Sequence, residues 1–136
     1  MNNRRRKKLS RRLVWAARLG SAAEVAALLR AGAPAQTYDS EGSTPLYAAS
    51  VQGNTDSVRL LLAAGALPDT ESGGGTEGTP LCGAACWGHA GAVRELLAHG
   101  ADPRLCEDGG SGRSPLYWAQ REPHPETVRL LEEAGA

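Results

Sequence analysis

Apolar residues recur along the chain with the spacing of one helix face, and the pattern repeats every 33 to 35 residues. A valine and a leucine precede a Gly-Ala pair by seven and four residues in each of four places. The valines are Val25, Val58, Val93 and Val128, the leucines are Leu28, Leu61, Leu96 and Leu131, and the glycines are Gly32, Gly65, Gly100 and Gly135. Residues spaced in this way line one side of an α-helix, so each repeat contains one half-buried helix. Self-similarity at this period is typical of a solenoid of stacked units.

Start and stop signals frame the helices of each repeat. Thr44-Pro45, Thr79-Pro80 and Ser114-Pro115 are spaced 35 residues apart and predict a capping hydroxyl followed by proline in the first helical turn. A second helix then ends at the Gly-Ala pair, because glycine accepts the left-handed conformation that follows many helices. Between the two helices the chain turns at Gly20, Gly53, Gly88 and Pro123. Each repeat is therefore a helix-turn-helix unit.

The segments between the units are polar and rich in Gly, Asp and Ser, as hairpin loops are. The second and third of them, after Gly65 and Gly100, are two residues longer than the first. We expect an all-α solenoid of four units, at about residues 9–41, 42–76, 77–111 and 112–136, joined by β-hairpin-type loops. Residues 1–8 are expected to form a basic, disordered arm.

These residues resemble the ankyrin repeat. The family pattern Thr-Pro-Leu-His-x-Ala-Ala, Gly-His and Gly-Ala-Asp has its clearest match in the third unit, in the segments 79–85, 88–89 and 100–102. The resemblance spans about Leu9 to Ala136. Two departures place charge at the ends of the array: Arg11-Arg12 stands where Thr-Pro is usual, and Glu132 replaces a leucine. Polar substitutions at terminal units are expected, since the outer face of such a unit has no neighbour.

Composition and charge fit this interpretation and add one feature. The 136 residues are 41% apolar and 22% charged, without phenylalanine, and the formal net charge is zero. Residues 1–30 nevertheless carry nine Arg and Lys against Glu24 alone, a net of +8, whereas residues 31–136 carry a net of −8. No apolar run is long enough for a membrane span. Three cysteines, an odd number, do not form a disulfide framework, so we expect a cytoplasmic protein.

Several motifs that carry chemistry elsewhere have simpler explanations here. A zinc site could draw its ligands from Cys82, Cys86, His89 and Cys106, but buried cysteines and a turn histidine explain these residues better. The glycine runs at 73–75 and 109–110 lack the Lys-Ser/Thr of a phosphate loop and are expected at hairpin tips. The sequence therefore predicts no enzyme, no cofactor and no metal.

The family resemblance implies that function lies on the concave surface formed by hairpins and first helices. We expect a protein partner to bind the variable positions there, with Trp87 and Tyr38 as aromatic anchors. Trp87 packing against its neighbouring unit is an equally open alternative, and Trp15 and Trp118 are expected in the core. The predicted partner-binding positions are Tyr38, Ser40, Glu41, Ser43, Val51, Gln52, Glu77, Cys86, Trp87, Arg113, Arg121 and Glu122.

The sequence thus favours a non-enzymatic protein-protein interaction module, an adaptor or an inhibitor, that is a monomer or a weak oligomer. The alternative is a nucleic-acid-associated protein that uses its basic residues for non-specific attachment to phosphates. The candidate anion-binding residues are Arg4, Arg5, Arg6, Lys7, Lys8, Arg11 and Arg12.

Overall fold

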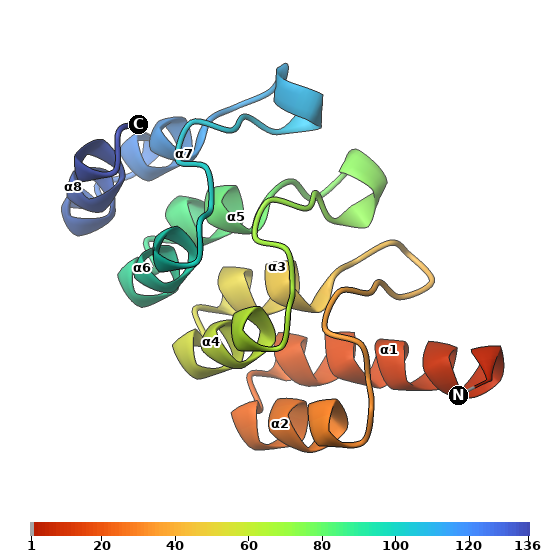
Figure 1. Ribbon diagram of the computed structural model, residues 1–136. Coiled ribbons are helices and arrows are strands. Elements are labelled where there is room, and N and C mark those ends of the chain that lie inside the picture. The colour runs from red at the N-terminus through yellow and green to blue at the C-terminus, as the bar shows by residue number, and fades with distance from the viewer. Residues whose placement is uncertain (1) are drawn as a thin grey trace.

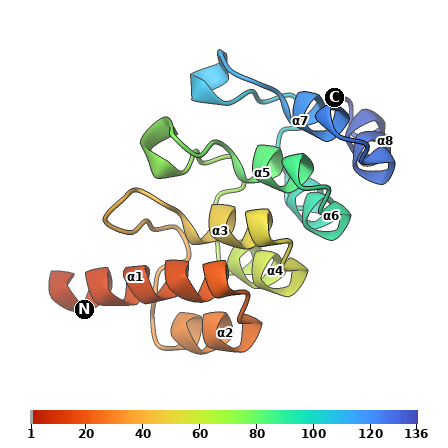
Figure 2. The same ribbon diagram turned by 180° about the vertical axis from the view of Figure 1, so that it is seen from behind.

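The computed structural model describes residues 2–136 as a stack of helix pairs in two layers (Figures 1 and 2). The first helices of the pairs form one layer: α1 (Asn3–Leu19), α3 (Pro45–Gln52), α5 (Pro80–Cys86) and α7 (Pro115–Arg121). The second helices form the other: α2 (Ala22–Arg30), α4 (Thr55–Ala63), α6 (Ala90–Ala98) and α8 (Pro125–Glu133). Each helix contacts its pair partner and the equivalent helices of adjacent units. The predicted all-α solenoid is confirmed.

Hydroxyl caps begin three of the four first helices, at the predicted positions. The side chains of Thr44, Thr79 and Ser114 each accept a hydrogen bond from the backbone N–H three residues further on, at 3.2, 3.2 and 3.0 Å. Proline follows each cap at a position where no intrahelical N–H is needed. A Ser, Thr or Asn cap contributes typically about 1 kcal/mol to helix stability, so these caps fix where the units begin.

The turns inside the second and third units place one repeat against the next. Gly53 has φ 70°, and a Cβ there would overlap the ring of His89 in the following unit. His89 Nε2 lies 3.0 Å from the carbonyl oxygen of Val51, and His124 Nε2 lies 3.2 Å from that of Cys86. These histidines satisfy carbonyls at the ends of first helices, which confirms the structural role predicted for His89.

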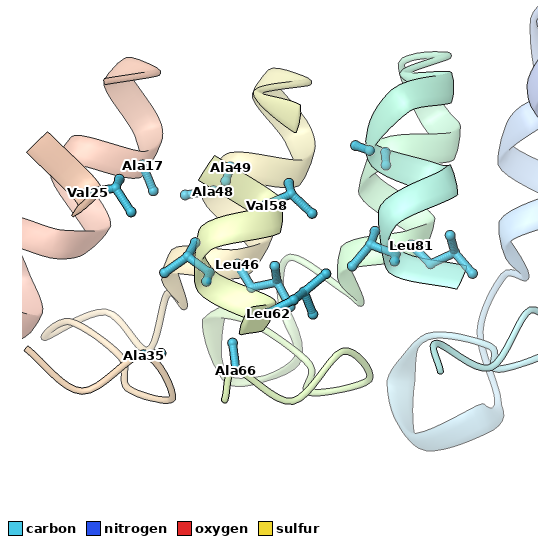
Figure 3. Close-up of a cluster of buried hydrophobic side chains, with 14 of the residues drawn as sticks. Ala17, Val25, Ala35, Leu46, Ala48, Ala49, Val58, Leu62, Ala66 and Leu81 are labelled. Carbon is cyan, nitrogen blue, oxygen red and sulfur yellow. The ribbon is translucent and has the colours of Figure 1, made fainter. Parts of the chain in front are cut away.

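The core consists of the repeated valines and leucines together with many alanines (Figure 3). Val25, Val58 and Val93 are fully buried, and so are Leu61, Leu96 and Leu131 on α4, α6 and α8. Burying one such side chain contributes about 1.5–3 kcal/mol. The small residues allow the first helices to approach closely: a Cβ on Gly83 would lie 2.8 Å from Val51 Cγ2. The core is thus a continuous row of small contacts between neighbouring units.

The hairpin loops are held to one another along the stack. The Gly73 N–H donates to the Gly42 carbonyl at 2.8 Å, and the hydroxyls of Ser43 and Ser72 both donate to Glu77 Oε1 at 2.8 Å. The extra residues of the longer loops form 3-10 turns at Gly73–Gly75 and Asp108–Gly110. No strand forms within residues 2–136, where the only ladder element is an isolated bridge between Ser72 and Gly78.

The prediction of a disordered arm at residues 1–8 is corrected for the part that the structure describes. Residues 3–8 are the first turns of α1, and Met1 lies outside the described residues. The Asn2 side chain caps this helix by accepting the Arg5 N–H at 2.8 Å. Leu9 and Ser10 are buried, and the Ser10 hydroxyl lies 2.6 Å from that of Thr37. The helix therefore continues past the expected boundary because its next turn is anchored to the first hairpin. None of the described helices is long and apolar enough to cross a membrane.

Candidate interaction surface

A row of exposed side chains runs across the ends of the first helices. In each unit the residue just before the turn occupies this row: Leu19, Gln52, Trp87 and Glu122. Trp87 is 63% exposed and Leu19 is 66% exposed. Trp87 is the C-cap residue of α5, and within residues 2–136 no aromatic ring or cation stacks on its indole. Of the two alternatives for Trp87, the structure therefore selects the exposed one.

The first hairpin adds a second exposed aromatic side chain. Tyr38 is 70% exposed, and Ser40 and Glu41 are exposed beside it. The hairpin is ordered by Asp39, whose Oδ1 accepts the N–H groups of Glu41 and Ser43 at 2.9 and 3.0 Å. An aromatic side chain on a fixed turn loses little entropy when it is buried by a ligand.

The last unit presents charged side chains that stack on its own aromatic rings. The Arg113 guanidinium carbon lies 4.3 Å from the Tyr117 ring centroid, and that of Arg121 lies 5.5 Å from the Trp118 ring centroid. Tyr117 and Trp118 themselves contact edge to face at 5.3 Å. These contacts orient Arg113 and Arg121 at the surface, where both are exposed together with Glu122.

The prediction that Ser43 belongs to the partner surface is wrong, and other predicted surface residues have a structural role. Ser43 is only 3% exposed and donates to Glu77, so it belongs to the hairpin framework and not to the partner surface. Glu77 is half-buried and uses its carboxylate between two hairpins. Val51 and Cys86 are also half-buried, although they border the exposed row.

Trp15 departs from its expected place in the core, since it is 57% exposed. The equivalent residue in the third unit, Gly83, faces Tyr47 and Val51 of the preceding first helix. Within the described residues no unit precedes α1 (Figure 2), so Trp15 has no preceding first helix to pack against. Trp118 has a preceding unit and packs against the core, as expected.

Leu19 was missed by reasoning from residue types, because a leucine in a helix is normally assigned to the core. The available signal was its register: it precedes Gly20 as Trp87 precedes Gly88. Its exposure extends the row of residues to the first unit.

The three cysteines are not joined in a disulfide, and two of them, Cys82 and Cys86, are poorly suited to nucleophilic chemistry. Burial raises the pKa of the Cys82 thiol to about 12, and burial also raises that of Cys86, with Arg121 opposing the shift. A thiol with a raised pKa has little of the reactive thiolate form. Among residues 2–136 no cluster of three or more His, Cys, Asp or Glu side chains is arranged to hold a metal ion.

Comparison with known protein families identifies the repeat from which the chain is built. A family model described as ankyrin repeats (3 copies) matches residues 6–72 and 68–136. The chain belongs to the ankyrin-repeat family. No curated protein matches the chain significantly. Ankyrin repeats generally mediate protein-protein interactions and are typically non-enzymatic, so the repeats of this chain imply a protein partner.

Proposed function

We propose that this ankyrin-repeat protein is a non-enzymatic interaction module, an adaptor or an inhibitor, that binds a partner protein across its first helices and hairpins. The observation that carries the proposal is Trp87, a large aromatic side chain that is 63% exposed at the centre of the stack. Interface hot spots are enriched in tryptophan because its burial removes much apolar surface from water at a small entropic cost.

The surroundings of Trp87 support a binding role for the whole row. Gln52 and Glu122 flank it on the equivalent positions of the neighbouring units, and Tyr38 stands on the first hairpin. The helices beneath are fixed by buried framework contacts, so a partner meets a largely preformed surface. Polar and charged neighbours around an aromatic anchor are the usual composition of an interface rim.

The acidic hairpins are proposed to set specificity. Glu41, Glu71, Glu107 and Asp108 lie on successive hairpins, and a partner with basic side chains opposite them would be favoured over an acidic one. We also propose a cytoplasmic location, since the three cysteines are unpaired. Non-specific attachment to nucleic acid remains the second proposal, supported by the exposed cations of α1 alone.

The test is affinity capture from a nuclease-treated lysate of the native source with the full chain as bait. We expect the variant Trp87→Ala, Tyr38→Ala to lose one discrete protein that the original chain retains. The matched control is Trp15→Ala, which removes an equally large and similarly exposed indole from the end face of α1. A partner site centred on Trp87 would be contradicted if the test variant and the Trp15→Ala control both lost the captured protein equally, or if both retained it.

A further inference from the structure

The first turns of α1 carry an unusual density of unpaired positive charge. Seven Arg and Lys side chains lie between Arg4 and Arg12, and all are exposed. Of these seven, only Arg12 forms an ion pair with another described residue, Glu24, at 3.2 Å. Arg4, Lys8 and Arg11 follow the i, i+4, i+7 spacing, so they share one side of the helix. Like charges at this spacing destabilise a helix by a few tenths of a kcal/mol per pair, a cost that an anionic ligand would remove.

A groove lies between these turns and the first hairpin. Its volume is about 1110 Å³, and its lining includes Arg4, Lys7, Lys8 and Arg11 on the helix side and Thr37, Tyr38 and Asp39 on the hairpin side. The start of α1 projects to the same side of the molecule as the hairpins (Figures 1 and 2). The helix and the hairpin that form the two walls are fixed to each other. The hydroxyls of Ser10 on α1 and Thr37 on the hairpin are 2.6 Å apart, and the neighbouring Leu9 of α1 is buried in the core.

We propose that this groove, hereafter the basic groove, binds an extended acidic segment of a protein partner. Carboxylates of such a segment would pair with the helix cations, while the exposed ring of Tyr38 would cover its backbone or an apolar residue. Tyr38 also borders the proposed partner surface, so one partner can contact both. The proposal rests on the proposed function only in taking the ligand to be part of a protein.

The charge of the rest of the molecule favours a short acidic segment over nucleic acid. Residues 31–136 carry a net charge of −8, and Asp39 and Glu41 lie on the same hairpin as Tyr38. A nucleic acid strand long enough to neutralise several cations would extend over these acidic hairpins and be repelled by them. An acidic peptide segment confined to the groove meets only Asp39 of these carboxylates, since Asp39 lines the groove beside Tyr38 and Glu41 does not.

The experiment measures binding of a fluorescein-labelled peptide of alternating aspartate and glycine to the full chain by fluorescence anisotropy, without any partner. Reference ligands are the same peptide with asparagine for aspartate and a single-stranded oligothymidylate of equal charge. The test variant is Lys8→Glu, Arg11→Glu, whose side chains are exposed and form no ion pair among the described residues. The control is Arg104→Glu, an exposed arginine in the loop after α6 that also forms none.

We expect the test variant to bind the acidic peptide roughly tenfold or more weakly than the original chain, and Arg104→Glu to change affinity far less. The variant Lys8→Gln, Arg11→Gln keeps the helix while removing the charges, and it should lose most of the binding with unchanged circular dichroism. The proposal is overturned if the acidic peptide binds no better than the asparagine peptide, if the oligothymidylate binds more tightly, or if the groove variants retain affinity. Self-association of the chain through the groove would also overturn the proposal, because the ligand would then be a second copy of this chain. It would be seen as a larger molecular mass in solution that the variant Lys8→Glu, Arg11→Glu no longer shows. None of these readouts depends on Trp87, so failure here leaves the proposed function standing.

Discussion

Gly53 shows how single residues set the geometry of the array. Its φ of 70° is a conformation that side chains other than glycine adopt at a cost, and the ring of His89 fills the space where a Cβ would stand. The same ring satisfies the Val51 carbonyl at 3.0 Å. One position therefore serves the turn, the contact between units and the end of a first helix.

Gly53→Ala should consequently lower the free energy of unfolding by about 1–3 kcal/mol, because backbone strain and displacement of His89 act together. Urea denaturation followed by circular dichroism measures this change. Gly74→Ala is the control, since Gly74 has a similar φ of 61° but open space around its Cβ position. If Gly74→Ala lowers the free energy of unfolding as much as Gly53→Ala does, the contact with His89 contributes nothing to stability.

At the scale of elements, local signals predicted the units well. The caps Thr44 and Thr79 and the Gly-Ala pairs are short-range features. The helices therefore begin after the caps and end before the Gly-Ala pairs, where the sequence indicates. The start of α1 was misjudged because its anchor, the contact between Ser10 and Thr37, joins residues 27 positions apart. Trp15 was misjudged for a related reason, as its burial depends on whether a unit precedes it. Exposure at Trp87 required the structure, since a terminal helical position can face either neighbour or solvent.

Among the hairpin residues, Glu107 offers a test of the packing between loops. Burial raises the pKa of its carboxyl, and Asp108 and Glu71 add to the shift. The folded state then binds the proton more tightly than the unfolded state, so the charged form of Glu107 costs stability above its folded pKa, and this cost disappears as the pH falls toward the unfolded value.

Glu107→Gln should therefore raise the thermal midpoint at about pH 7 and have a smaller effect at about pH 4, near the ordinary pKa of a glutamate carboxyl in the unfolded chain. Differential scanning calorimetry at both pH values measures the difference. The control Glu41→Gln removes an exposed carboxylate from another hairpin. Two results would contradict the desolvation of Glu107. One is a thermal midpoint of Glu107→Gln below that of the original chain at about pH 7, and the other is an increase in the thermal midpoint that is equally large at low pH.

The whole molecule combines a uniform scaffold with an uneven surface. Units are joined along the second helices by ion pairs, Arg59 with Glu95 at 3.0 Å and Arg94 with Glu126, and along the first helices by small apolar contacts. Stability in such an array is close to a sum over units and their interfaces. The scaffold could be predicted from the repeat alone, whereas the partner surface depends on side chains that vary between units. The charge of the surface is also uneven, since the cations are concentrated at the start of α1 and acidic residues lie on each of the hairpins.

The most direct test of the central claim is site-specific photocrosslinking in the native lysate. A photoreactive amino acid is placed at Gln52 or Glu122, which flank Trp87 on the exposed row, or at Ala63 and Ala98 on the second helices. We predict that one protein is crosslinked from both flanking positions, and that Trp87→Ala removes that product. A partner crosslinked from Ala63 or Ala98 and from neither flanking position would contradict binding across the first helices.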